Sequence, residues 1–98
     1  MLTSRQRGYL SSLAVSINPT VMIGKEGASE SVIRALRAEF GIRELVKLRF
    51  IGGKDERKEI ALALAEKTGS ELVRVIGNVA VFYKCAKEAE RRLIELPS

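Results

Sequence analysis

The chain has 98 residues, of which 46% are hydrophobic and 30% are charged. This length fits one domain, and the composition is that of a water-soluble globular protein rather than of a disordered chain. Lysine and arginine number 17 against 12 aspartate and glutamate residues, which gives a net charge of +5. The positive charge favours a polyanionic partner such as nucleic acid.

Residue types that supply much of enzyme chemistry are scarce. Histidine is absent, which removes the usual general base and the commonest metal ligand, and Cys85 is the only cysteine. No apolar run approaches the roughly 20 residues that span a bilayer, and residues 1–7 lack the apolar stretch of a signal peptide. We therefore expect a cytoplasmic protein that is not an enzyme, with no metal, no cofactor, no small-molecule substrate and no membrane contact.

The N-terminal residues are predicted to form a helix and then a strand. Thr3 and Gln6 have the spacing of a capping box, and apolar residues recur at helical spacing after them, which predicts a helix over 4–14. After an Asn-Pro turn, the β-branched and apolar run 20–23 predicts a short buried strand. The helix would need a separate apolar surface against which to bury Tyr9, Leu10 and Leu13.

A second helix and a second strand follow. Ser29 is a candidate N-cap, and Gly41 would close the helix. In residues 44–51 an apolar face alternates with a mixed apolar and basic face, which predicts a strand with two unequal faces. The helix stripe expected in the core is Val32, Ile33, Leu36 and Phe40, and the expected core face of the strand is Val46, Leu48 and Phe50.

The C-terminal half predicts a helix, a hairpin and a helical tail. Asp55 can cap the third helix, which would run to Gly69 with an inner stripe of apolar residues. Two β-rich runs, 72–76 and 79–83, are separated by Gly-Asn, which is the chemistry of a two-residue hairpin. Residues 86–95 have helical propensity but a thin apolar stripe. The inner stripe of the third helix is Ile60, Ala61, Leu64, Ala65 and Thr68.

Together these elements predict a single α/β domain over residues 1–98. The order is α-β-α-β-α-β-β with a helical C-terminal tail, and the strands should form a four-stranded mixed sheet. We expect the second and third helices on the same face of this sheet, since the strands that they connect must bury both apolar stripes.

The glycine loop between the first strand and the second helix is the most informative motif. Its residues are Gly24, Lys25, Glu26 and Gly27. Glycines let the backbone approach a ligand closely, and the following helix offers free amides and the positive end of its dipole, so the loop could hold a phosphate. Two glycines can equally serve a tight turn alone, and the spacing matches neither a P-loop nor a dinucleotide motif. The spacing alone leaves both interpretations open.

Further basic residues fall into two predicted groups. One group, on the second and third helices, could form a rim around the loop, and the other shares one sheet face or its margin. Either group could follow a phosphate backbone or form an ordinary solvated surface. The rim group is Arg34, Arg37, Lys54, Arg57 and Lys58, and the sheet group is Lys47, Arg49, Arg74 and Lys84.

Several segments, taken in order, resemble the CRM domain, named for chloroplast RNA splicing and ribosome maturation, in its single-domain YhbY-like form. They are 20–29, 44–48, 67–73, 75–77 and 82–84, and the likeness covers about residues 2–84, leaving 85–98 as a tail. The resemblance implies an RNA-binding α/β fold similar to the C-terminal domain of translation initiation factor three. It also implies association with precursors of the large ribosomal subunit, and RNA contact at the GxxG loop of residues 24–27 and at flanking basic residues.

The leading hypothesis is therefore a monomeric, non-catalytic RNA-binding protein that acts on ribosomal RNA or on large-subunit precursors during ribosome assembly. The alternative is a small basic adaptor that binds an acidic protein and makes no direct RNA contact. Steep salt dependence of RNA binding would favour the first hypothesis.

Overall fold

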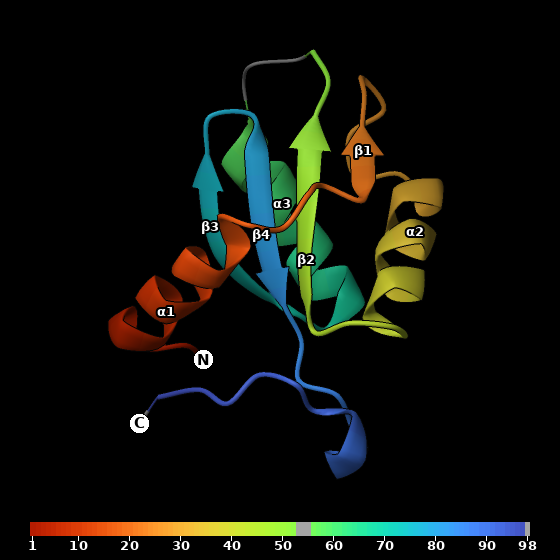
Figure 1. The fold of residues 1–98 in the computed structure, drawn as a ribbon. Coiled ribbons are helices and arrows are strands. Elements are labelled where there is room, and N and C mark those ends of the chain that lie inside the picture. Colours follow the sequence, from red (N-terminus) through yellow and green to blue (C-terminus); the bar gives the residue numbers. More distant parts are fainter. Residues whose placement is uncertain (53–55, 98) are drawn as a thin grey trace.

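The computed structural model describes residues 1–52 and 56–97, and only the backbone of residue 91. Figure 1 shows the elements in chain order. They are α1 (Ser4–Ala14), β1 (Val21–Ile23), α2 (Glu30–Phe40), β2 (Leu45–Phe50), α3 (Arg57–Thr68), β3 (Glu71–Ile76), β4 (Val79–Tyr83) and a short 3-10 helix (Ala89–Arg91).

The strands form one mixed sheet in the order β1-β2-β4-β3. β1 pairs with β2 in parallel, whereas β4 is antiparallel to both β2 and β3. The predicted hairpin is confirmed, with Gly77 at a φ of 56° in the turn between β3 and β4. The predicted order of elements and the four-stranded mixed sheet are confirmed as well.

This topology gives the molecule two distinct ends. β1, β2 and β3 all finish at the same end of the sheet, so the segments 24–29, 51–52 and 77–78 gather there, and we call it the loop end (Figure 1). The segments 41–44, 69–70 and 84–97 lie at the opposite end, which we call the tail end.

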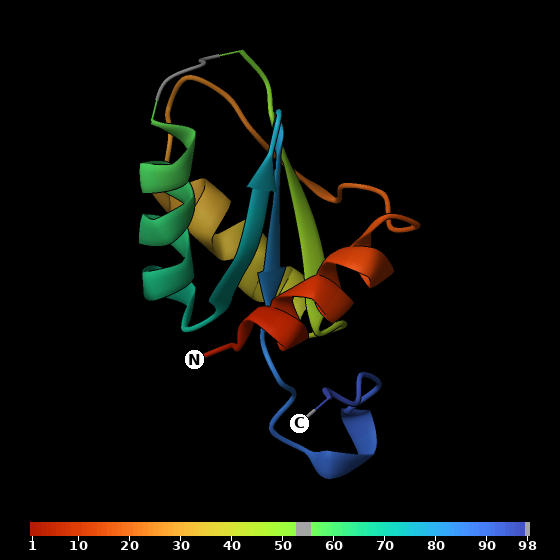
Figure 2. The ribbon, with the colours of Figure 1, turned by 90° about the vertical axis from the view of Figure 1, so that its left-hand side faces the viewer.

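The helices lie on both faces of the sheet. Figure 2 shows α2 and α3 together on one face and α1 on the other, as expected from the two apolar stripes. Val46, Leu48 and Phe50 of β2 face α2 and α3 in the larger core, as predicted. Leu36 and Leu64, one from each helix, are fully buried in this core.

The first helix has the predicted capping box and a smaller core of its own. The Thr3 Oγ1 accepts a hydrogen bond from the Gln6 N–H at 3.1 Å, and the Thr3 N–H donates to the Gln6 Oε1 at 3.0 Å. Leu10 is fully buried, but the prediction for Tyr9 is wrong, since this side chain is 39% exposed. Neighbouring residues point about 100° apart around a helix, and the buried line passes through Leu10 and Ala14, one turn apart.

The predicted tail helix is wrong. Residues 84–97 are irregular apart from the 3-10 helix, because the buried Glu44 side chain binds the tail backbone. The Glu44 carboxylate accepts hydrogen bonds from the backbone N–H of Ala86, Leu93 and Ile94 at 2.8 to 3.0 Å. In an α-helix the last two N–H groups would bond to carbonyls four residues earlier, so this arrangement excludes a continuous helix.

The start of α3 departs from the expected cap. Asp55, the predicted N-cap, lies outside the described residues. Glu56 occupies the position before the helix with a left-handed φ of 65° and no capping hydrogen bond from its side chain. Gly69 ends α3 in the left-handed conformation, as predicted for a C-terminal glycine.

Candidate functional site

The glycine loop is a tight turn between β1 and α2. The Gly27 N–H donates to the Gly24 carbonyl at 3.4 Å, and the Ser29 N–H donates to the Gly27 carbonyl at 2.8 Å. Gly27 has a φ of 65°, which a residue with a side chain rarely adopts. A Cβ at Gly24 would meet only the end of the flexible Glu26 side chain, at 2.9 Å. The turn itself therefore requires glycine at position 27 but not at 24.

The loop leads directly into the N-terminus of α2. Ser29 caps this helix as predicted, because its Oγ accepts from the Val32 N–H at 3.4 Å. Lys25 and Glu26 project from the turn as exposed side chains. They have no hydrogen bond or ion pair within the described residues, so the Lys25 ammonium is available to an external anion.

Three of the residues predicted to contact RNA donate hydrogen bonds to backbone carbonyls at helix C-termini. The Lys47 Nζ donates to the carbonyls of Ala14 and Ile17, at 3.0 and 3.1 Å, at the end of α1. The Lys84 Nζ donates to the Thr68 carbonyl at 3.0 Å, at the end of α3. Arg37 donates from Nη2 to the Lys67 carbonyl at 2.9 Å in the same place. These cations complement the negative ends of two helix dipoles.

The predicted rim is thereby divided between the two ends of the molecule. Arg37 lies in the last turn of α2 and contacts the end of α3, so it belongs to the tail end and not to the surroundings of the glycine loop. Arg57, by contrast, begins α3 at the loop end, where its Nη1 donates to the Gly77 carbonyl at 2.6 Å. Its guanidinium also lies 5.6 Å from the centre of the Phe50 ring. Lys54 lies outside the described residues.

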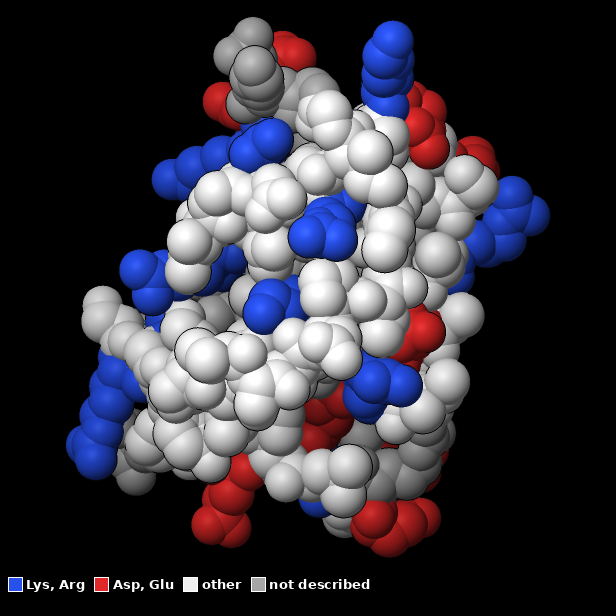
Figure 3. Space-filling view, turned by 45° about the horizontal axis from the view of Figure 1, so that its top comes forward, with Lys and Arg blue, Asp and Glu red and all other residues white. Residues whose placement is uncertain are grey.

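A second set of predicted contact residues is exposed and has no internal hydrogen bond or ion pair within residues 1–52 and 56–97. Lys25 and Lys58 lie at the loop end, Arg34 on the outer side of α2, and Arg49 and Arg74 on the strands. Figure 3, which brings the loop end forward, shows basic side chains spread over this face and acidic ones mainly at its margins. The set is Lys25, Arg34, Arg49, Lys58 and Arg74.

The two strand arginines share the sheet face that carries α1. Arg49 pairs in register with Val79, and Arg74 with Val81, which packs against α1. Lys47 lies on the same face, opposite Val81. The predicted common face is therefore confirmed for these three residues, although Lys47 already has two carbonyl partners.

The described residues form neither a metal-binding cluster nor a membrane-spanning helix. Among the described residues, no three His, Cys, Asp or Glu side chains lie together as metal ligands would. No helix within the part of the chain that the structure describes is long and apolar enough to cross a bilayer.

Arg7 is a further cation close to the sheet that no sequence pattern singled out. This α1 residue is half-buried and lines one groove together with Arg74 and Lys58. Its position one turn before Leu10 is the signal that could have found it, since residues three apart on a helix lie on the same side.

The chain is similar to several known proteins over nearly its full length. Residues 2–84 match the family model of the CRS1 / YhbY (CRM) domain. The "Probable RNA-binding protein YqeI" of Bacillus subtilis is 37% identical over 99% of this chain and 100% of its own. An "RNA-binding protein" of Haemophilus influenzae is 32% identical over 98% of this chain and 95% of its own. The solution structure of the hypothetical protein SAV1595 from Staphylococcus aureus, "a putative RNA binding protein", superposes with a TM-score of 0.85 at 44% identity and covers 99% of this chain and 100% of the other.

Proposed function

The chain belongs to the CRS1 / YhbY (CRM) domain family, and from this premise we propose that it is a monomeric RNA-binding protein that contacts RNA at its loop end. Relatives that match nearly the whole chain are named as RNA-binding proteins and not as enzymes. The observation that carries the proposal is the exposed Lys25 at the tip of the glycine turn, which has no partner among the described residues.

The loop can act on phosphates through two kinds of group. The Lys25 ammonium supplies a mobile positive charge, and the start of α2 supplies the positive end of the helix dipole. Lys58 and Arg57 at the start of α3 extend the positive charge along the same end of the molecule. Contacts of this type bind the phosphate backbone with little regard to base sequence.

The RNA that we propose for this site is ribosomal RNA, bound in the cytoplasm as part of a precursor of the large ribosomal subunit. The resemblance to single-domain CRM proteins supports this choice. Ultraviolet crosslinking in cells, followed by sequencing of the RNA bound to the purified protein, tests it. Enrichment of large-subunit precursor RNA is the expected result, and enrichment of messenger or transfer RNA would contradict it.

A salt titration tests RNA binding itself. For a structured RNA fragment, the logarithm of the binding constant should fall linearly with the logarithm of salt concentration, with a slope of about −0.7 to −0.9 for each phosphate contact. An acidic protein with the same net negative charge as the RNA fragment serves as the competitor. If that protein binds as tightly as RNA and displaces it, the basic adaptor becomes the better description.

A further inference from the structure

A groove crosses the free edge of β3. This strand is the last in the sheet, with β4 on one side and no strand paired to its other side within the described residues. The groove has a volume of about 570 Å³ and lies between α1 and α3. Its basic lining residues are Arg7, Lys58 and Arg74, and its apolar ones include Leu62, Leu72 and Val75. Its one acidic lining residue among those described, Glu71, is paired with the N-terminal ammonium of Met1 at 3.9 Å, so the three cations keep an excess of positive charge.

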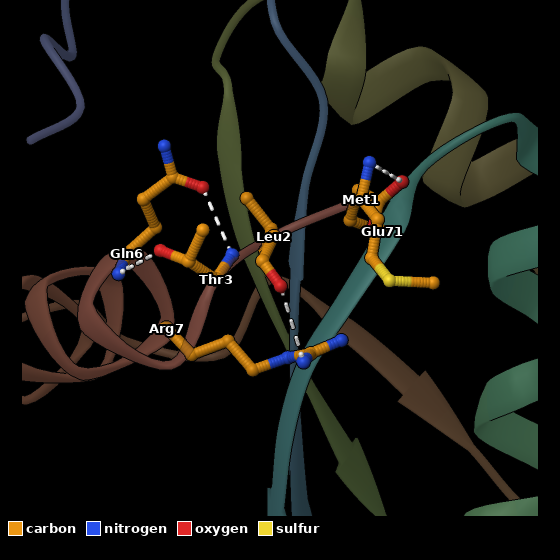
Figure 4. A network of polar contacts seen from close by, with 6 residues as sticks. All are labelled: Met1, Leu2, Thr3, Gln6, Arg7 and Glu71. Atoms are coloured by element: carbon orange, nitrogen blue, oxygen red, sulfur yellow. Dashed lines mark hydrogen bonds and ion pairs between the residues drawn. The ribbon is translucent and has the colours of Figure 1, made fainter. Parts of the chain in front are cut away.

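The three cations come from three different elements. Arg7 extends from α1 toward the sheet, where its Nη1 donates weakly to the Leu2 carbonyl at 3.4 Å (Figure 4). Lys58 lies in the first turn of α3, on the opposite face of the sheet. Arg74 belongs to β3 itself, between the two helices. The positive charge therefore spans the thickness of the sheet at this edge.

An irregularity in β3 places Arg74 on the side of Arg7. The register shifts between Leu72, which pairs with Phe82, and Arg74, which pairs with Val81. Phe82 belongs to the core under α2 and α3, whereas Val81 belongs to the core under α1. In a regular strand, residues two apart share a face, so the shift is what turns Arg74 toward α1.

The groove also offers apolar surface between its charges. Leu62, one turn after Lys58 on α3, is 51% exposed, and Leu72 and Val75 are half-buried beside it. A double-stranded RNA presents mainly phosphates and sugars, whereas an unpaired strand presents phosphates together with the faces of its bases. The alternation of cations with apolar side chains matches the second kind of ligand.

We propose that this groove binds an unpaired RNA strand, with phosphates at Arg7, Lys58 and Arg74 and a base against Leu62. The proposal rests on the proposed RNA-binding function and adds a second contact region to it. The start of α3 connects the two regions, since Lys58 lines the groove and Ile60 lies under Gly27 of the loop. One RNA molecule with a structured part and a single-stranded extension can therefore reach both.

The test compares two double variants of equal charge. Arg7→Ala with Arg74→Ala removes two groove cations, while Arg5→Ala with Lys67→Ala removes two exposed cations of α1 and α3 that do not line the groove. Each variant is titrated with an RNA hairpin and with the same hairpin carrying a single-stranded extension, at several salt concentrations. Thermal melts confirm that both variants are folded.

For the groove variant, the affinity for the extended hairpin should fall on the order of tenfold at 0.1 M salt, and the salt slope should decrease by about 1.4, as expected when two single-strand phosphate contacts are lost. Affinity for the plain hairpin should match that of the control variant. Equal behaviour of both double variants on both RNAs would overturn the groove proposal while leaving RNA binding intact. Failure of the unmodified protein to bind either RNA would instead overturn the proposed function.

A third variant, Leu62→Ala, tests the apolar contact without changing charge. Its affinity for the extended hairpin should fall severalfold, with the salt slope unchanged. The edge of β3 could instead accept a strand from another protein. If a polyglutamate peptide binds the unmodified protein but not the groove variant, while both bind the extended hairpin equally, the groove is a protein site and the proposal is wrong.

Discussion

The two ends of the sheet differ in how their lysines are used, although Arg57 at the loop end also donates to a backbone carbonyl. At the tail end, Arg37 and Lys84 both donate to carbonyls at the C-terminus of α3, and their charges stabilise the fold. At the loop end, Lys25 and Lys58 are exposed and have no hydrogen bond or ion pair among the described residues. A count of lysines and arginines cannot distinguish these uses. A lysine or arginine is therefore a candidate for RNA contact only after its internal partners are known.

The largest expected effect lies in the core that supports both ends. Leu36→Ala and Leu64→Ala should each lower the free energy of unfolding by about 2–5 kcal/mol, because both side chains are fully buried and their removal leaves a cavity. Chemical denaturation measures this change. RNA affinity at a temperature where the variants are folded should stay near that of the unmodified protein. Transitions that do not move would contradict the assigned core.

The next effect tests the tail end. Replacing Glu44 by Ala removes a carboxylate that accepts hydrogen bonds from Ala86, Leu93 and Ile94. Charge-assisted hydrogen bonds contribute about 1.5–3 kcal/mol, so hydrogen exchange at these amides should accelerate at least about tenfold. Glu44→Gln, which keeps an acceptor oxygen, should give a smaller change. RNA binding at the loop end should be unaffected by either variant.

The same carboxylate predicts a pH dependence. Burial raises the pKa of Glu44, but the hydrogen bonds from Ala86, Ile94, Leu93 and Cys85 lower it, and the net result is a pKa below the ordinary 4.5. A lowered pKa stabilises the folded state above the ordinary value, and this contribution is lost as the pH falls through the folded pKa. Amide exchange of the tail should therefore increase below about pH 4.5 relative to the core. Tail protection that is constant down to pH 2 would disprove this role.

A smaller effect on stability, but a large one on binding, is expected at the turn of the loop end. Gly27→Val places a β-branched residue at a left-handed φ, which costs about 1–3 kcal/mol. RNA affinity should fall more than for Lys25→Ala, because the side chain also obstructs close approach of a phosphate. Gly24→Ala is the matched control, since its Cβ would meet only a flexible side chain. If Gly27→Val binds RNA with the same affinity as Gly24→Ala and the unmodified protein, the loop is only a turn.

The smallest expected changes come from single cations, one at each end of the sheet. Lys25→Ala should leave stability unchanged and reduce the salt slope of RNA binding by about 0.7–0.9, as for one lost phosphate contact. Arg37→Ala should do the reverse, lowering the melting temperature slightly through the lost hydrogen bond to the Lys67 carbonyl and leaving the slope unchanged. Measuring both variants by thermal melts and salt titrations decides whether the two ends differ as described.

Local signals in the sequence were sufficient for most of the fold. The capping box at Thr3, the N-cap at Ser29 and the glycine turn after Ile76 each act within a few residues, and all three form as predicted. The tail could not be predicted in this way, because its N–H groups bond to a carboxylate 42 to 50 residues away. Helical propensity in 86–95 is therefore overridden by a distant partner.

The candidate site shows the same limit. The glycine turn and Lys25 could be located from spacing, but the partners of Lys47 and Lys84 are carbonyls 30 to 33 and 16 residues away. Arg74 faces α1 only because β3 shifts its register, and Arg7 joins it from another helix. Residues that the fold brings together from separate elements carry no common pattern in the sequence.

The position of the termini has a practical consequence. Both lie at the end of the molecule away from the glycine loop, where the Gln6 Nε2 donates to the Pro97 carbonyl at 3.0 Å (Figure 1). A tag, a fluorophore or a second protein fused to either terminus would therefore leave the loop end exposed. The chain can also be attached to a sensor surface through either terminus with the loop end directed into solution, so measurements of binding at the loop end should agree between the two orientations.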